Sequence, residues 1–263
     1  MIAGYGSVPC DERPDPEVAY WEVEAEDYYE EHGQFLGDER LVWCPEGLDE
    51  AEVHLLGDVA GVRTLEIGCG AAQGSRWAAA AGARAVGIDL SAGMLRVAAR
   101  LGAAGFALVQ SDAAALPFAD QTFDLAFTAM GALPFVPSLA AVHREVARVL
   151  RPGGRWVFST DHPLAWVFPD SPDPELLTVT RSYFNRQPYF ERSDDGRLRY
   201  TQYHATLADH VTALVEAGFT IDRLIEPEWP DRGGADDGQW GAWSRDRGRL
   251  VPSTLIIAAH LSR

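Results

Sequence analysis

The sequence of 263 residues contains no lysine, and all 22 of its basic side chains are arginines. The absence of lysine excludes Walker-type phosphate loops, Schiff-base chemistry and a pyridoxal-phosphate anchor. Cysteine is also scarce, and the three cysteines are widely spaced, which argues against a disulfide framework and against a CxxC-type metal site. The seven histidines show no i, i+4 pairing, so we expect no bound metal.

Long apolar runs are absent as well. No stretch approaches the run of about eighteen apolar residues that a membrane-spanning helix needs. Residues 1–17 lack both the basic region and the apolar region of a secretory signal. We therefore expect a cytoplasmic protein that does not associate with a membrane.

Acidic side chains are abundant, and the formal net charge is −17. Residues 11–52 alone contain sixteen acidic side chains and only two arginines. Such a surface repels a phosphate backbone, which disfavours a nucleic-acid substrate and favours a small molecule. The chain is 47% hydrophobic, so it can bury a full core, and its length fits one large α/β domain with additions.

The N-terminal quarter is predicted to stand apart from the rest. Residues 1–14 read as a loose tail. Aromatic and apolar residues then recur at helical spacing over 15–33, which predicts an acidic amphipathic helix with an aromatic face. A second helical stretch is expected at 47–57. We interpret residues 1–57 as a tail and a helical cap, and residues 58–263 as the main domain.

Strands and helices alternate along the main domain. The expected strands are 62–67, 83–89, 106–112, 123–129, 154–161, 219–226 and 253–261. The expected helices are 73–82, 91–101, 138–150 and 206–218. The alternation predicts an α/β fold with a doubly wound, mostly parallel, seven-stranded sheet covered by helices on both sides. The stretch 162–205 breaks this rhythm and is predicted to be an insertion that contains a hairpin.

One glycine turn carries most of the functional information. The sequence LEIGCGAAQGS, residues 65–75, has the spacing G-x-G-x-x-x-G, which differs from the dinucleotide fingerprint G-x-G-x-x-G. Glu66 stands two residues before the first glycine. A carboxylate at this place repels a pyrophosphate, but it can anchor the ammonium group of an amino-acid moiety. A phosphate is therefore the weaker candidate ligand.

Four motifs in order give the chain a resemblance to a known family. LEIGCGAAQGS is followed by VGIDLS (86–91), SDAAALPFADQTFDLAF (111–127) and VLRPGGRWVFS (149–159). This set resembles the motifs of class I S-adenosylmethionine-dependent methyltransferases, in the group that contains small-molecule and quinone-type enzymes. The resemblance covers about residues 60–162. It implies a Rossmann-like methyltransferase fold and S-adenosyl-L-methionine as the cofactor.

The resemblance also implies cofactor-binding roles for individual residues. Asp89 would accept hydrogen bonds from the ribose hydroxyls, and Asp112 would bind the exocyclic amine of adenine. The other residues that would contact the cofactor are Glu66, Gly68, Cys69, Gly70, Leu90, Met94, Ala113, Ala129 and Met130. Simpler roles remain open: the glycines can make a tight turn, Met94 can be a core residue, and Asp112 can cap a helix.

Candidate catalytic residues follow the fifth strand, where ligands of doubly wound sheets lie. Methyl transfer needs alignment of the nucleophile and exclusion of water, and it needs a general base only for some acceptors. We predict His162 as that base, with Asp161 orienting it. The alternative is that His162 only shapes the turn before Pro163.

Aromatic residues outside the cofactor motifs are candidates for binding the substrate. They would form a lid and an apolar chamber. The candidates are Trp21, Tyr28, Tyr29, Tyr183, Tyr189, His204 and Trp240. Core packing, or a dimer contact made by the hairpin, is the alternative.

The predicted function is transfer of a methyl group to a small, hydrophobic or aromatic metabolite at oxygen, nitrogen or carbon. Two alternatives stay open: a module that binds S-adenosylmethionine without catalysis, and a nicotinamide-dependent oxidoreductase. The sequence names neither the acceptor nor the oligomeric state. The partner is expected to be a small molecule.

Overall fold

The computed structural model describes residues 1–9, 12–15, 19–231 and 241–262. Its main sheet has the strand order β4-β3-β2-β5-β6-β10-β9. The bounds are β2 (Arg63–Ile67), β3 (Arg84–Asp89), β4 (Phe106–Gln110), β5 (Phe123–Thr128), β6 (Leu150–Asp161), β9 (Phe219–Ile225) and β10 (Thr254–Leu261). β10 runs antiparallel to β6 and β9, and the other neighbours are parallel. The predicted seven-stranded, mostly parallel sheet is confirmed.

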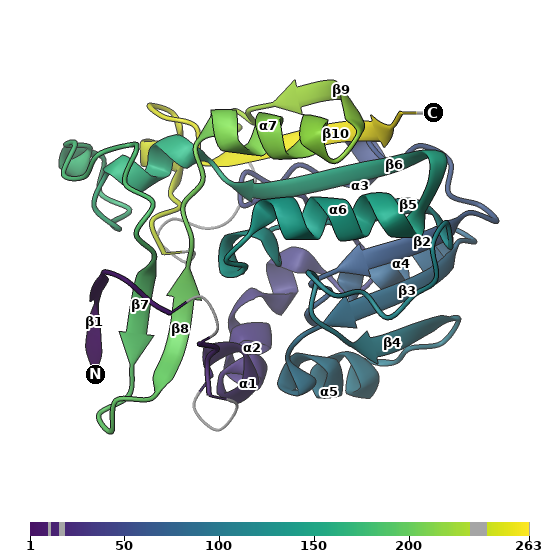
Figure 1. The fold of residues 1–263 in the computed structure, drawn as a ribbon, viewed down its shortest axis with the longest axis horizontal. Helices are drawn as coiled ribbons and strands as arrows, with labels where there is room; N and C mark the ends of the chain where they lie inside the picture. Colours follow the sequence, from purple (N-terminus) through teal and green to yellow (C-terminus); the bar gives the residue numbers. More distant parts are fainter. Residues whose placement is uncertain (10–11, 16–18, 232–240, 263) are drawn as a thin grey trace.

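Helices cover both faces of this sheet (Figure 1). The flanking helices are α3 (Glu50–Val53), α4 (Gln73–Ala80), α5 (Ala92–Leu101), α6 (Leu139–Val149) and α7 (Leu207–Glu216). Side chains of a strand point alternately to its two faces. In β10, Leu255 and Ile257 accordingly join the core under α6 and α7, whereas Ile256 and Ala258 join the core on the α4 side.

Cap residues fix where these helices begin. The Ser91 hydroxyl accepts a hydrogen bond from the Met94 amide at 3.0 Å, at the start of α5. At the start of α7, Thr206 and Asp209 each accept a hydrogen bond from the backbone amide of the other, which is a capping box. Both helices therefore begin where the sequence predicted.

A second, antiparallel sheet has the order β1-β7-β8. It consists of β1 (Ile2–Tyr5), β7 (Tyr189–Arg192) and β8 (Leu198–Gln202), and it includes the predicted hairpin. The expectation of a loose tail over residues 1–14 is wrong for β1, because β1 pairs along its whole length with β7. The partner strand lies more than 180 residues away in the sequence, so no local pattern reveals the pairing.

The N-terminal helices also differ from the prediction. The described part of the single helix predicted over 15–33 is divided into α1 (Tyr20–Val23) and α2 (Ala25–Leu36), which meet at Glu24. The helix predicted at 47–57 is reduced to α3, because His54 adopts a left-handed conformation with φ of 49°. Further short helices span Leu133–Phe135, Pro163–Val167, Pro174–Leu176 and, as α8, Arg245–Gly248.

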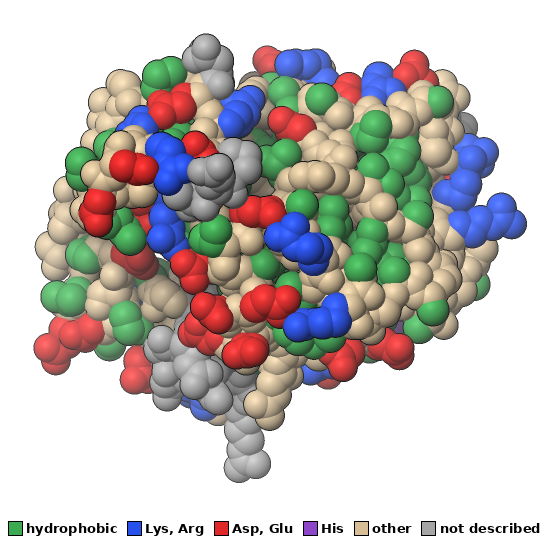
Figure 2. Space-filling model, turned by 90° about the horizontal axis from the view of Figure 1, so that it is seen from below, with side chains coloured by type: hydrophobic (Ala, Val, Ile, Leu, Met, Phe, Trp, Pro, Cys, Tyr) green, Lys and Arg blue, Asp and Glu red, His purple; other side chains and the backbone are tan. Residues whose placement is uncertain are grey.

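The carboxyl ends of the parallel strands face α1, α2 and the three-stranded sheet (Figure 1). Figure 2 views this part of the molecule from below and shows acidic side chains gathered over α1 and α2. Two ion pairs join this acidic segment to α5, Glu22 with Arg96 and Glu26 with Arg100. Among the described helices, none combines the length and the hydropathy needed to cross a bilayer.

Candidate active site

The glycine turn after β2 lies against the loop after β5. Gly68 has a φ of 65°, and a Cβ added to it would lie 2.9 Å from the Ala132 amide nitrogen. A Cβ on Gly131 would lie 2.7 Å from the Gly68 carbonyl oxygen. Only glycine at these positions permits such a close approach of the two backbones. The two loops therefore form one rigid floor at the carboxyl ends of neighbouring strands.

Glu66 lies buried beneath this turn and is 6% exposed. The Ser75 hydroxyl donates a hydrogen bond to its Oε2 at 2.5 Å. Burial raises the pKa of Glu66 to about 7, although the Ser75 hydrogen bond opposes this shift. Gly74 leaves the space for the carboxylate, because a Cβ there would lie 2.3 Å from Glu66 Oε1.

Asp89 connects the glycine turn to the start of α5. Its Oδ2 accepts a hydrogen bond from the Gly70 amide at 2.8 Å, and its Oδ1 accepts one from the Ser91 amide at 2.9 Å. Ser91 itself caps α5, so Asp89 is free of that role. Each carboxylate oxygen has capacity for a second hydrogen bond, which is what a ribose diol requires.

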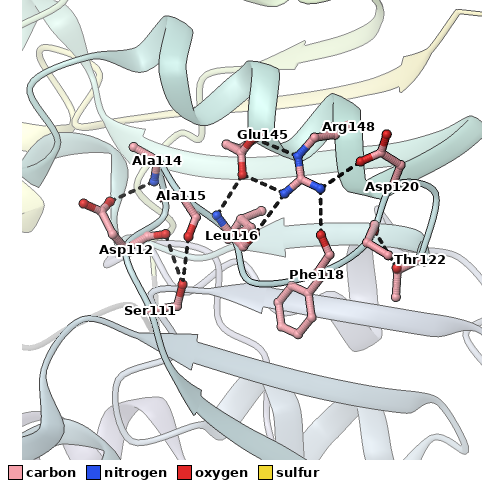
Figure 3. Close-up of polar contacts among 11 residues, drawn as sticks. Ser111, Asp112, Ala114, Ala115, Leu116, Phe118, Asp120, Thr122, Glu145 and Arg148 are labelled. Atoms are coloured by element: carbon pink, nitrogen blue, oxygen red, sulfur yellow. Dashed lines mark hydrogen bonds and ion pairs between the residues drawn. The ribbon is translucent and has the colours of Figure 1, made fainter.

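The loop after β4, which carries Asp112 and Ala113, is clamped by α6 (Figure 3). Arg148 donates to the carbonyl oxygens of Leu116 at 2.9 Å and Phe118 at 2.6 Å. Arg148 also pairs with Glu145, whose carboxylate accepts a hydrogen bond from the Leu116 amide at 2.8 Å. This clamp was not predicted from the sequence, in which the i, i+3 spacing of Glu145 and Arg148 is the one feature that indicates it.

These loops surround a cavity of about 570 Å³, which we call the cofactor cavity. Every residue that the resemblance assigns to the cofactor lines it. They are Glu66, Gly68, Cys69, Gly70, Asp89, Leu90, Met94, Asp112, Ala113, Ala129 and Met130. The structure therefore brings the whole predicted set together.

The helix α1 closes one side of the cofactor cavity. Glu22 Oε2 accepts hydrogen bonds from the Gly93 amide at 2.9 Å and from the Ser91 hydroxyl at 3.0 Å. A Cβ on Gly93 would lie 2.4 Å from the Glu22 carbonyl oxygen, so the contact needs glycine. Sequence reasoning did not identify this junction of α1 with α5, because 69 residues separate Glu22 from Ser91.

A second cavity of about 1010 Å³, which we call the aromatic chamber, adjoins the first. Six aromatic residues line both cavities: Tyr20, Trp21, Tyr28, Phe135, Tyr200 and Tyr203.

The predicted substrate-binding residues are distributed unevenly over the two cavities. Tyr189 and His204 line the aromatic chamber, and Tyr29 lines only the cofactor cavity. Tyr183 is absent from the lining of both cavities in the described structure, and its hydroxyl accepts a hydrogen bond from the Leu207 amide. Trp240 lies outside the described residues. Trp21 and Tyr28 belong to the wall shared by the two cavities.

His162 and Asp161 both line the aromatic chamber, but they have different partners. His162 Nδ1 accepts a hydrogen bond from the Leu164 amide at 3.1 Å, and its Nε2 lies 2.9 Å from Glu226 Oε1. Asp161 instead accepts a hydrogen bond from Gln202 Nε2 at 2.5 Å. The expected orientation of His162 by Asp161 is therefore not what the structure shows, because consecutive side chains at the end of a strand point apart. Burial raises the pKa of Asp161 to about 6.

The described residues contain no group of three or more His, Cys, Asp or Glu side chains arranged to hold a metal ion. Cys44 and Cys69 are free and buried, and burial raises the pKa of both thiols. Cys10 lies outside the described residues.

Comparison with known proteins places this geometry in a family. Residues 65–158 match the family model described as a methyltransferase domain. The chain contains a methyltransferase domain. A solved S-adenosylmethionine-dependent methyltransferase from Mesorhizobium loti is 28% identical to this chain, with a TM-score of 0.61 over 80% of this chain and 95% of that chain. The predicted methyltransferase domain and the predicted fold are confirmed.

Curated relatives of the methyltransferase domain match over shorter stretches. A malonyl-[acyl-carrier protein] O-methyltransferase from Methylococcus capsulatus is 43% identical over 102 residues, which are 37% of each protein. A fatty-acid O-methyltransferase from Mycolicibacterium smegmatis is 38% identical over 109 residues, which are 40% of this chain and 39% of the relative. The chain thus spans less than half the length of these relatives.

Proposed function

We propose that the protein transfers the methyl group of S-adenosyl-L-methionine to a small-molecule acceptor held in the aromatic chamber. The observation that carries this proposal is the shared wall: Tyr20, Trp21, Met130, Phe135 and Tyr200 line both cavities. A transfer reaction needs two ligands whose reacting atoms meet, and adjoining cavities supply that arrangement. The size and aromatic lining of the chamber favour a hydrophobic or aromatic acceptor.

The residues of the cofactor cavity fit the proposed cofactor chemically. The floor formed by Gly68 and Gly131 is a cradle that a Cβ would fill. Asp89 offers acceptors for a ribose diol, Asp112 for an adenine amine, and buried Glu66 offers a carboxylate for the cationic amino-acid end. When bound there, S-adenosylmethionine supplies a methyl group that its sulfonium has already activated.

Residues of the chain itself must hold the acceptor and exclude water. Where the acceptor carries a proton, a base is needed. We assign this role to Asp161, because both ring nitrogens of His162 already have partners. Asp161→Asn and His162→Asn separate the two candidates. We expect Asp161→Asn to lower turnover about a hundredfold or more, and His162→Asn to lower it much less.

Calorimetry and product release test the proposed function. The full chain should bind S-adenosylmethionine and, with a panel of small aromatic and apolar acceptors, release S-adenosylhomocysteine. Tight binding without release for any acceptor would instead support a binding module without catalysis. Thermal stabilisation by a nicotinamide dinucleotide and none by S-adenosylmethionine would overturn the proposal in favour of an oxidoreductase.

A further inference from the structure

One face of the three-stranded sheet forms a wall of the aromatic chamber. Tyr5 of β1 lies opposite Tyr189 of β7, which lies opposite Gln202 of β8. Side chains opposite each other in paired strands share a face, and so do residues two apart. Tyr200 and Glu191 therefore point the same way as these three. All five side chains line the chamber.

The rings on this wall continue into a belt that reaches the cofactor cavity. The ring centroids of Tyr5 and Tyr189 are 5.4 Å apart, and those of Tyr189 and Tyr200 are 6.2 Å apart. Tyr20 lies 5.7 Å from Tyr200 and 5.0 Å from Trp21. The faces of such rings carry negative electrostatic potential and attract cations. The belt thus leads from the chamber to the shared wall.

Asp161 adds a formal negative charge at this belt. Among the described residues its hydrogen-bond partner is the neutral amide of Gln202, and no arginine or histidine pairs with it within 4 Å. Burial raises the pKa of the Tyr200 phenol, and the nearby Asp161 charge raises it further. A carboxylate without a countercharge in an aromatic enclosure attracts a cationic ligand.

The arginines that line the chamber have partners other than Asp161. The Arg181 guanidinium lies 4.4 Å from the ring centroid of Tyr5 and donates to two backbone carbonyl groups. Arg247 likewise donates to two backbone carbonyl groups, and Arg186 forms a bidentate pair with Asp209. Burial lowers the pKa of the lining histidines, which keeps them neutral near pH 7: His32, His162, His204 and His210.

We propose that the aromatic chamber selects a small amine, with the nitrogen between the Asp161 carboxylate and the rings of Tyr189 and Tyr200. The assignment of this amine as a substrate rests on the proposed function. The bound ammonium first loses a proton through Asp161 to solvent, which frees the nitrogen lone pair. This lone pair forms the new N–C bond as the S–C bond breaks, and the sulfur keeps the bonding electron pair. Positive charge therefore moves from the sulfur onto the nitrogen. A carboxylate and ring faces stabilise that charge, whereas transfer to a carboxylate acceptor cancels charge and gains nothing from them.

Equilibrium binding to the full chain, without cofactor, tests the inference directly. The probes are 2-phenylethylamine, 2-phenylethanol and phenylacetate, which share a ring and differ in charge. At pH 7 we expect the amine to bind about tenfold more tightly than the alcohol, and phenylacetate to bind most weakly. Equal affinities, or no binding of the amine, would overturn the inference. Tightest binding of phenylacetate would also overturn it and would assign the chamber to anions through Arg181.

Variants identify the groups responsible. Asp161→Asn should weaken binding of the amine about tenfold and leave the alcohol unchanged, whereas the matched surface change Glu52→Gln should affect neither. Tyr200→Phe should retain the preference for the amine and Tyr200→Leu should reduce it, with circular dichroism reporting the fold of each variant. An unchanged preference in folded Asp161→Asn would contradict the inference.

Titration of S-adenosylmethionine into the same protein sample distinguishes failure of the amine inference from failure of the proposed function. Binding of the cofactor without a preference for the amine rejects the amine and leaves the proposed function. A preference for the amine without binding of the cofactor rejects the proposed function and leaves the cation site.

Discussion

The cofactor cavity and the aromatic chamber lie side by side, yet they are built in different ways. The residues predicted to bind the cofactor lie at the ends of successive strands and in the loops that follow them, all between Glu66 and Met130. The chamber depends on β1, β7 and β8, in which Tyr5 pairs with a residue more than 180 positions away. Local motifs thus fix the first site, whereas long-range strand pairing fixes the second. Substitutions around the cofactor cavity and in the three-stranded sheet should therefore differ in their effects on stability and on ligand binding.

The largest difference is expected in the free energy of unfolding, when alanine replaces one glycine beside the cofactor cavity and one glycine in the three-stranded sheet. Gly74→Ala places a Cβ 2.3 Å from Glu66 Oε1 and 2.9 Å from the Phe127 ring, which should lower the free energy of unfolding by about 3 kcal/mol. Gly4→Ala in β1 is the control, because no atom of the described residues beyond its two chain neighbours lies within 4 Å of the added Cβ, and it should change stability by less than about 0.5 kcal/mol. Urea unfolding measures both. Similar small losses would contradict the close packing around Glu66.

Asp89→Asn tests the polar end of the cofactor cavity. We expect the affinity for S-adenosylmethionine, measured by calorimetry, to fall about tenfold to a hundredfold, because charged acceptors make the stronger hydrogen bonds. Asp58→Asn is a matched control: like Asp89, it accepts a hydrogen bond from the amide two residues later, but it is exposed and lines neither cavity. An equal loss of affinity in both variants would refute the role of Asp89.

The pH dependence of stability tests the buried carboxylate of Glu66. Its folded pKa of about 7 lies above the unfolded value of about 4.3, so between these values the folded state binds more protons. The contribution of Glu66 to stability is therefore full below pH 4 and is lost as the pH rises to 7. Relative to Glu66→Gln, the wild type should lose about 2 kcal/mol between pH 5 and pH 7.5.

The comparison with Glu66→Gln is needed because buried histidines act with the opposite sign. His143, whose pKa burial lowers to about 3, makes the folded state less stable as the pH falls below 6.5. That effect is common to the wild type and the variant and cancels in the difference. Parallel stability curves for the two proteins would contradict the raised pKa of Glu66.

The smallest effect is expected at the clamp on the loop after β4. Arg148→Gln removes the hydrogen bonds to Leu116 and Phe118 and should cost about 1 kcal/mol of stability, with a few-fold loss of affinity for S-adenosylmethionine. Arg144→Gln, on the same helix and exposed, should change neither quantity. Thermal unfolding and calorimetry compare the two variants. Identical behaviour would show that the clamp does not position the loop.

The contrast between the two cavities also explains what the sequence could predict. Strands, caps and glycine turns are local, so the strands and helices of the main domain could be inferred from periodicity, and the candidate cofactor residues from the family resemblance of the motifs. The pairing of β1 with β7 could not, because its hydrogen bonds join backbones rather than a recognisable pair of side chains. The partner of His162 was missed for a different reason, because Glu226 lies 64 residues further along the chain.

A crystal structure with S-adenosylhomocysteine would locate the cofactor relative to both cavities. We expect the adenosyl group against Asp89 and Asp112, the amino-acid end near Glu66, and the sulfur directed toward the wall shared with the aromatic chamber. Density for the ligand away from these carboxylates, or a sulfur directed away from the chamber, would contradict this expectation.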